Sequence, residues 1–266
     1  PRRAGRRMIA DLTALLPLTE GILWAGFLVF LRVGAMLAFV PAFGEQSVPV
    51  RIRLGLGLAF TLIVLPGVAA DLPAPGSLIA TVGMAGAELA TGLFMGLILR
   101  MFVLTLQIAG TIAAQSTSLS QIFGGSAGID PMPAIGNILV IAGLALAVLL
   151  GLHVRLAAFM IDSYTLVPAG QMIGPAVVSA LGLAEVARAF ALAFSLSAPF
   201  VVASLIYNVT LGVINRAMPQ LMVAFVGAPA ITAGGLALLL ISAPVLLSLW
   251  VKALDAFLAA PFAGLP

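Results

Sequence analysis

The sequence predicts an all-α membrane protein built from long apolar helices, and three observations support this fold class. Hydrophobic residues make up 62% of the 266 residues, charged residues only 8%, and the mean hydropathy is +1.24. Several apolar runs reach the roughly 20 residues that cross a hydrocarbon core about 30 Å thick. Proline and glycine clusters divide these runs into about six helices, some of them broken. We therefore expect long helical hairpins in a bilayer.

The first half contains three apolar runs after a polar N-terminal segment, residues 1–20, which has four arginines among its first seven residues. The runs are residues 22–43, 54–70 and 78–99. The first is predicted to end near Pro41, and the third at Arg100. In the third run, Gly92 and Gly96 have the spacing that lets helix backbones approach closely. Arginines flank the first run at both ends, so the positive-inside rule gives no consistent orientation.

The next predicted helix, about 101–121, carries one stripe of uncharged polar side chains, spaced four, four and three residues apart. The stripe consists of Gln107, Thr111, Gln115 and Ser118. It could line a wet path, or it could make ordinary hydrogen bonds between helices, worth about 0.6 kcal/mol each in membranes. The helix ends in a glycine-rich segment that cannot continue it.

The second half predicts a helix from residue 138 to Pro168, with His153 within it. Pro175 then starts a segment that runs to residue 214, with a kink expected at Pro199. A polar turn at 215–220 and a last run, 231–251, complete a hairpin.

Charged residues lie inside or beside the apolar runs, where a charge costs roughly 3 kcal/mol at mid-depth. Arg32, Glu88 and Arg100 are therefore expected to face protein or water, and Arg216 to make a subunit contact at the hairpin turn. We favour pairing with neighbouring subunits over an ion pathway. Glu88 and Arg100 are too far apart on one helix to pair, roughly 18 Å.

The composition argues against thiol and metal chemistry in this chain. The chain has no cysteine and one histidine, so it offers no thiolate and no metal cluster, and we expect no cofactor. Nucleic-acid binding lacks a basic patch after residue 7. A membrane protease is rejected for two reasons. The candidate nucleophile motif, Gly125-Ser126-Ala-Gly128, is followed by a proline-rich loop, and His153 is the only residue that could act as its base. A secondary transporter remains the alternative, with a midplane site between helices broken at Pro168 and Pro199.

The order of these features resembles the FliR family of flagellar export-gate proteins, whose injectisome counterpart is SctT. The resemblance covers some 230 residues and rests on short motifs in a shared order. These are Val48-Pro-Val-Arg51, Gly86-Ala-Glu88, Gly151-Leu-His153, Asp162-Ser-Tyr164, Asn215-Arg216 and Met218-Pro-Gln220.

The resemblance implies a FliP-like helical part, residues 21–185, followed by a FliQ-like hairpin, residues 186–266. It implies a non-enzymatic subunit of the flagellar basal body, spanning the bacterial inner membrane several times. FliP- and FliQ-like subunits would form with it a channel for unfolded proteins, and FlhA- and FlhB-like components would be further partners. A loop near 123–136 would plug the channel beside the polar stripe. The plug residues implied are Phe123, Gly124, Gly125, Ser126, Gly128, Ile129 and Met132.

Overall fold

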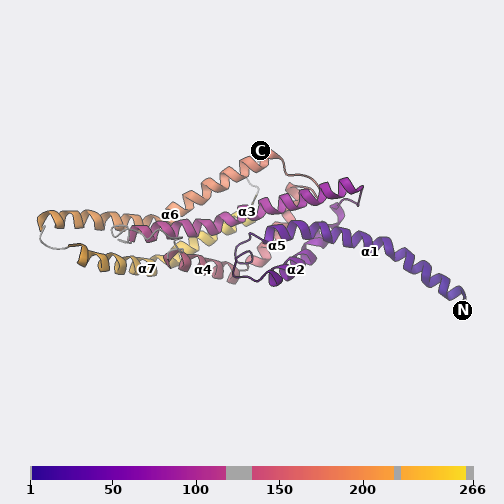
Figure 1. The fold of residues 1–266 in the computed structure, drawn as a ribbon, viewed down its shortest axis with the longest axis horizontal. Coiled ribbons are helices and arrows are strands. Elements are labelled where there is room, and N and C mark those ends of the chain that lie inside the picture. Colours follow the sequence, from indigo (N-terminus) through magenta and orange to yellow (C-terminus); the bar gives the residue numbers. More distant parts are fainter. Residues whose placement is uncertain (1, 118–133, 219–222, 262–266) are drawn as a thin grey trace. The chain divides into compact units, whose positions relative to one another are not determined.

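The computed structural model describes residues 2–117, 134–218 and 223–261, and this part of the chain is helical without strands. It contains seven α-helices and one 3₁₀ turn (Figure 1). They are α1 (Arg2–Leu37), α2 (Val50–Val68), η1 (Ala69–Asp71), α3 (Leu78–Thr117), α4 (Ala134–Leu149), α5 (Leu152–Leu166), α6 (Pro175–Ala217) and α7 (Val223–Ala259). The all-α prediction is confirmed.

Five of the described helical segments are long and apolar enough to cross a membrane. They lie in α1, in α2 with η1, in α3, in α6 and in α7. Helices α4 and α5 pass the same test together but are bent by 78° at a short break, so they count as a sixth span at most. This agrees with the prediction of about six apolar helices, some broken.

The chain divides into two compact units that interleave along the sequence. Unit 1 comprises residues 1–100, 152–182 and 258–266; unit 2 comprises residues 101–151 and 183–257. The division into a FliP-like part and a FliQ-like hairpin concerns similarity to other proteins, and it stays a prediction.

In unit 1, α1 packs against α2, and α2 also contacts α5. The close approach of α1 and α2 is possible because Gly57 leaves room for the Phe30 ring. At the start of the apolar part of α1, the indole nitrogen of Trp24 donates to the carbonyl oxygen of Pro73 at 2.9 Å. These contacts hold α1 beside the elements that carry the buried charges described below.

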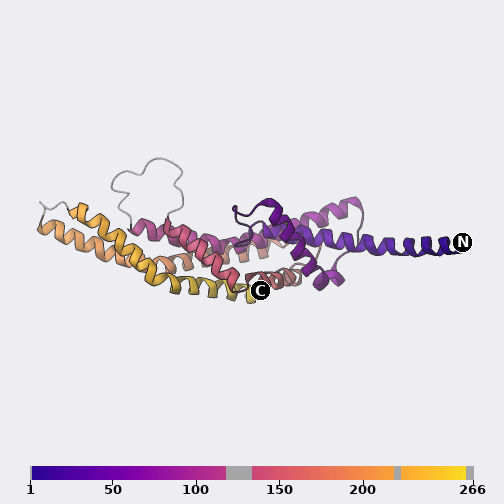
Figure 2. The same cartoon turned by 90° about the horizontal axis from the view of Figure 1, so that it is seen from below.

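Unit 2 contains α4, the last part of α3 and most of α6 and α7, and the last two run side by side in both views (Figures 1 and 2). Its centre is Trp250 of α7, whose side chain is fully buried. The indole nitrogen of Trp250 donates to the carbonyl oxygen of Phe102 at 2.8 Å. A Cβ at Gly143 would lie 3.5 Å from the same indole ring. One aromatic side chain thus joins α3, α4 and α7.

Three predicted helix boundaries are wrong. Arg100 does not end a helix, because arginine is a good helix former and α3 continues to Thr117. The helix expected from residue 138 to Pro168 breaks at Gly151, which has a φ of +86° that α-helices do not contain. The helix of the first apolar run was predicted to end near Pro41, but α1 ends at Leu37.

Candidate functional site

The two charges predicted inside apolar runs of the first half form one buried ion pair in unit 1. Arg32 of α1 donates from Nε to one Glu88 oxygen at 2.7 Å and from Nη2 to the other at 3.0 Å. Both side chains are completely buried. The paired geometry is bidentate, which is the strongest arrangement of guanidinium and carboxylate. The two charges therefore neutralise each other within the chain, without a neighbouring subunit.

Residues after the α4–α5 bend complete the shell of this pair. Arg32 Nη1 donates to the carbonyl oxygens of Ser163 and Val167, at 3.2 and 2.9 Å. The Tyr164 ring lies 3.7 Å from the guanidinium carbon, a cation–π contact. The backbone N–H of Gly170 donates to Glu88 at 2.7 Å. We call these groups, with Arg32 and Glu88, the buried ion-pair cluster; it joins α1, α3, α5 and the loop after α5.

Two glycines of α3 bring the pair together. A Cβ at Gly92 would collide with the carbonyl oxygen of Arg32, and one at Gly96 would lie 2.7 Å from the carbonyl oxygen of Met36. The α1 and α3 backbones therefore touch over about one helical turn. The predicted close approach at these glycines occurs between α1 and α3.

Arg100 forms a second ion pair within unit 1. Its Nη1 lies 2.6 Å from Glu45 in the loop between α1 and α2, and both side chains are about one fifth to one quarter exposed. Arg53 donates to the carbonyl oxygens of Glu45 and Val48 in the same loop. These contacts fix residues 38–49 against α2 and α3. A role for Arg100 in subunit contacts stays a prediction.

The described part of the predicted polar stripe lies on α3 in unit 2. Gln107 and Thr111 are half-buried and Gln115 is exposed, whereas Ser118 lies outside the described residues. The Thr111 hydroxyl donates to the Gln107 carbonyl oxygen at 2.8 Å, so it is satisfied within its own helix. The assignment of the stripe to the pore stays a prediction.

The predicted plug segment, residues 123–136, overlaps the start of α4, whose residues 134–136 are helical, and this first turn touches the α3 backbone. Gly110 of α3 and Gly136 of α4 are both buried, and a Cβ on Gly110 would collide with the Gly136 backbone. The plug residues Phe123, Gly124, Gly125, Ser126, Gly128, Ile129 and Met132 lie outside the described residues. The structure thus describes the helices that lead into this segment and how closely they pack.

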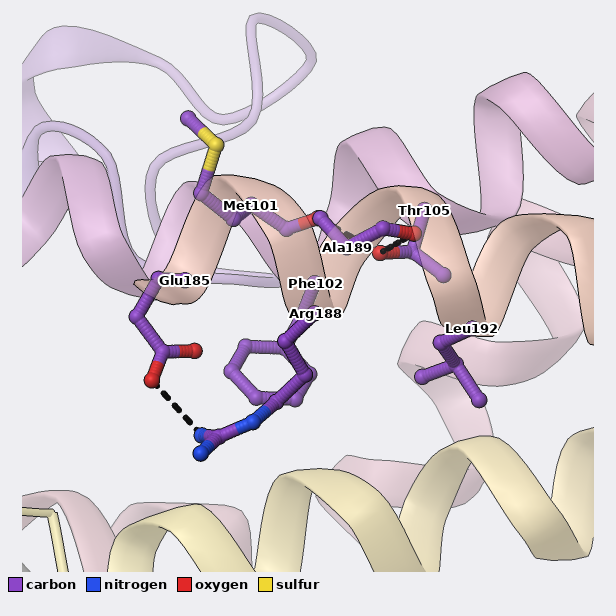
Figure 3. Close-up of a pocket in the computed structure, with 7 residues that line it drawn as sticks. All are labelled: Met101, Phe102, Thr105, Glu185, Arg188, Ala189 and Leu192. Atoms are coloured by element: carbon purple, nitrogen blue, oxygen red, sulfur yellow. Dashed lines mark hydrogen bonds and ion pairs between the residues drawn. The ribbon is translucent and has the colours of Figure 1, made fainter. Parts of the chain in front are cut away.

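Sequence reasoning did not single out a third ion pair, between Glu185 and Arg188 of α6. Figure 3 shows the two side chains pointing toward each other, with Arg188 Nη1 2.6 Å from Glu185 Oε1. Glu185 is 4% exposed and Arg188 is 51% exposed. The cavity beside them, next to Thr105, leaves about 10 Å³, which is room for about one water molecule. Their spacing of three residues in a helix was the available signal.

The remaining candidate residues do not belong to these clusters. His153 and Asp162 are both exposed on α5, and Arg216 is exposed in the last turn of α6. No group of three metal-ligating side chains occurs in the described part of the chain. The buried ion-pair cluster stabilises the packing of α1, α3 and α5.

These observations define a helical membrane protein whose buried charges are paired within the chain. The family model for bacterial export proteins, family 1, matches residues 23–257. The chain belongs to this family.

Several relatives carry the name flagellar biosynthetic protein FliR. The one from Caulobacter vibrioides is 34% identical over 225 residues, which cover 84% of this chain and 90% of the relative. The one from Escherichia coli K12 is 26% identical over 222 residues, covering 80% and 82%. The one from Aquifex aeolicus is 28% identical over 232 residues, covering 86% and 88%.

Proposed function

We propose that this protein is a core subunit of the flagellar protein export gate. The observation that carries the proposal is the family match over residues 23–257, together with relatives named for flagellar biosynthesis. Family and relatives make the chain a membrane-embedded component of the flagellar export apparatus. Within it, the chain forms with FliP- and FliQ-like subunits a helical channel for unfolded flagellar proteins, in the inner membrane at the basal body. FlhA- and FlhB-like components are its further partners.

The exposed apolar surface of α6 supports coverage by protein subunits. Leu183 is 74% exposed and Val213 is 64% exposed, and both lie in unit 2. Thirty residues of helix separate them, about 45 Å. A hydrocarbon core about 30 Å thick cannot cover that length even at a tilt of about 40°. Apolar helices of neighbouring subunits would cover the remainder.

The proposal gives the α3–α4 region a place at the channel. Gln107, Thr111, Gln115 and Ser118 would face the path of the exported chain, and the segment near 123–136 would close it. The backbone contact between Gly110 and Gly136 supports this role, because it keeps the two helices that lead into the segment close together.

The test is affinity purification of the tagged chain from its own membranes in mild detergent, followed by native mass spectrometry. We expect a complex of fixed ratio with FliP- and FliQ-like subunits. Arg216→Leu should lower the yield of that complex, and Lys252→Leu, another exposed cation in unit 2, serves as the matched control. A monomer or homodimer from native membranes would reject the proposal and favour the transporter alternative.

A second test addresses the plug. Deletion of residues 124–128 should leave the yield of the complex unchanged but raise the ion conductance of membranes that contain it. Unchanged conductance in a fully assembled complex would remove the plug assignment while leaving the subunit assignment intact. The two experiments therefore separate the identity of the protein from the role of this segment.

A further inference from the structure

Helix α2 and the turn η1 have the length of a hydrocarbon core and a charge at each end. Arg51 and Asp71 are both exposed and twenty residues apart, about 30 Å along a helix. They lie within the span Val50–Asp71, which is 22 residues long and has only five residues buried in the chain: Gly57, Phe60, Thr61, Val64 and Val68. No charged residue occurs from 54 to 70. This geometry puts Arg51 at the level of the lipid headgroups when α2 crosses a bilayer.

The outer face of α2 is an unbroken apolar row that starts at the same end. Val50, Leu54, Leu58 and Leu62 follow one another at intervals of four residues, so they share one side of the helix. Their exposed fractions are 75%, 53%, 51% and 71%. The row extends about 18 Å into the span from Val50. It offers acyl chains a continuous surface directly beside the arginine.

The Arg51 side chain has no ion-pair or hydrogen-bond partner among the described residues, because the other charged side chains at this end of α2 are paired with each other or with the backbone. Arg53 donates to two loop carbonyl oxygens, and the one nearby carboxylate, Glu45, is paired with Arg100. An arginine in the first turn of a helix opposes the helix dipole, so Arg51 does not serve to stabilise α2. The end therefore presents excess positive charge next to exposed apolar side chains.

We propose that this end of α2 binds an anionic phospholipid. The Arg51 guanidinium pairs with the headgroup phosphate, which accepts two parallel N–H bonds, and the acyl chains lie along the row from Val50 to Leu62. The match between the charged ends and the thickness of a hydrocarbon core favours lipid over protein as the occupant, since a protein contact imposes no such length. The proposal rests on the structure of α2 and not on the export assignment.

Native mass spectrometry of the purified full chain, with any co-purifying subunits, tests the proposal. The protein is titrated in detergent with phosphatidylglycerol or phosphatidylcholine of identical acyl chains. We expect tighter binding of phosphatidylglycerol and a roughly fivefold weaker affinity for it in Arg51→Gln, the effect of about one interfacial arginine. Lys252→Gln removes an equal exposed charge from unit 2 and should retain the preference.

Several outcomes would overturn the proposal, and four of them concern lipid binding. They are equal affinity for the two lipids, an unchanged affinity in Arg51→Gln, an equal loss in Lys252→Gln, and abolition of the preference by inorganic phosphate, which would identify a site for free anions. If Arg51→Gln lowers the recovery of co-purifying subunits and not of lipid, the surface contacts protein and the proposal is also wrong. Equal unfolding temperatures of the variants and the parent chain make each outcome interpretable.

Discussion

Neutralising Glu88 should destabilise the protein strongly, because it leaves the Arg32 guanidinium buried without its counter-charge. Both side chains have no solvent exposure, and the pair makes two hydrogen bonds of 2.7 and 3.0 Å. Removing one member of such a pair typically costs about 3–5 kcal/mol. Glu88→Gln keeps the shape of the side chain, so the loss reports charge and hydrogen bonding and not a cavity.

Removing both charges should cost much less than the sum of the single changes. Arg32→Met with Glu88→Leu leaves no unpaired charge, and replacing a complete buried pair by apolar residues is often nearly neutral. The remaining cost comes from groups that lose a partner: the Gly170 N–H loses its acceptor, and the Val167 carbonyl oxygen loses its donor. An unpaired buried donor of this kind costs about 1–3 kcal/mol. We therefore expect a strongly favourable coupling between the two sites.

The assay is reversible unfolding of the purified protein in mixed micelles, followed by circular dichroism, for both single variants and the double variant. The partly exposed pair of Arg100 and Glu45 provides the control, and Arg100→Gln should cost less than about 1 kcal/mol. The reasoning is refuted if Glu88→Gln costs no more than Arg100→Gln, or if the effects of the Arg32 and Glu88 changes are additive.

Three further predictions concern helix packing, each measured by the same unfolding assay. Gly110→Ala should cost about 1–3 kcal/mol, because the new methyl group must push α3 away from Gly136; a neutral effect would show that the two backbones are not in contact. A Cβ at Gly151 would meet no neighbouring atom, so Gly151→Ala should lower the free energy of unfolding only by the strain of its positive φ, about 1–2 kcal/mol. Trp250→Phe should cost about 1–3 kcal/mol, because it removes the hydrogen bond to the Phe102 carbonyl oxygen and part of a fully buried side chain, and a loss below about 0.5 kcal/mol would argue against that hydrogen bond.

The buried charges show how far sequence reasoning reaches. The cost of a charge in an apolar run predicts that Arg32 and Glu88 face something other than lipid, and both are fully buried. The identity of the partner depends on which helices cross. The two residues are 56 positions apart, and they meet because α1 and α3 touch at Gly92. A single sequence shows the small residues but not the helix that packs against them.

Helix boundaries were predicted least well, for a local reason. Gly151 lies in a run that is apolar on both sides, where one glycine is compatible with a continuous helix; its positive φ becomes known only with the structure. Arg100 was expected to end a helix because it is charged, yet the backbone has no preference against it. The packing role of Trp250 was missed, because a tryptophan in an apolar helix equally suits the membrane interface.

The members of the buried ion-pair cluster are translated at different times, and this affects how the chain enters the membrane. Arg32 is translated 56 residues before Glu88 and 135 residues before Val167. At about 5–20 residues per second, the arginine waits roughly 3–11 s for its counter-charge and roughly 7–27 s for the last carbonyl oxygen. During this interval α1 carries an uncompensated cation, so it must stay at the insertion machinery or beside another protein. Stable entry of the first helix into the bilayer therefore depends on helices made later, and truncated chains that end before Glu88 should be poorly retained in the membrane.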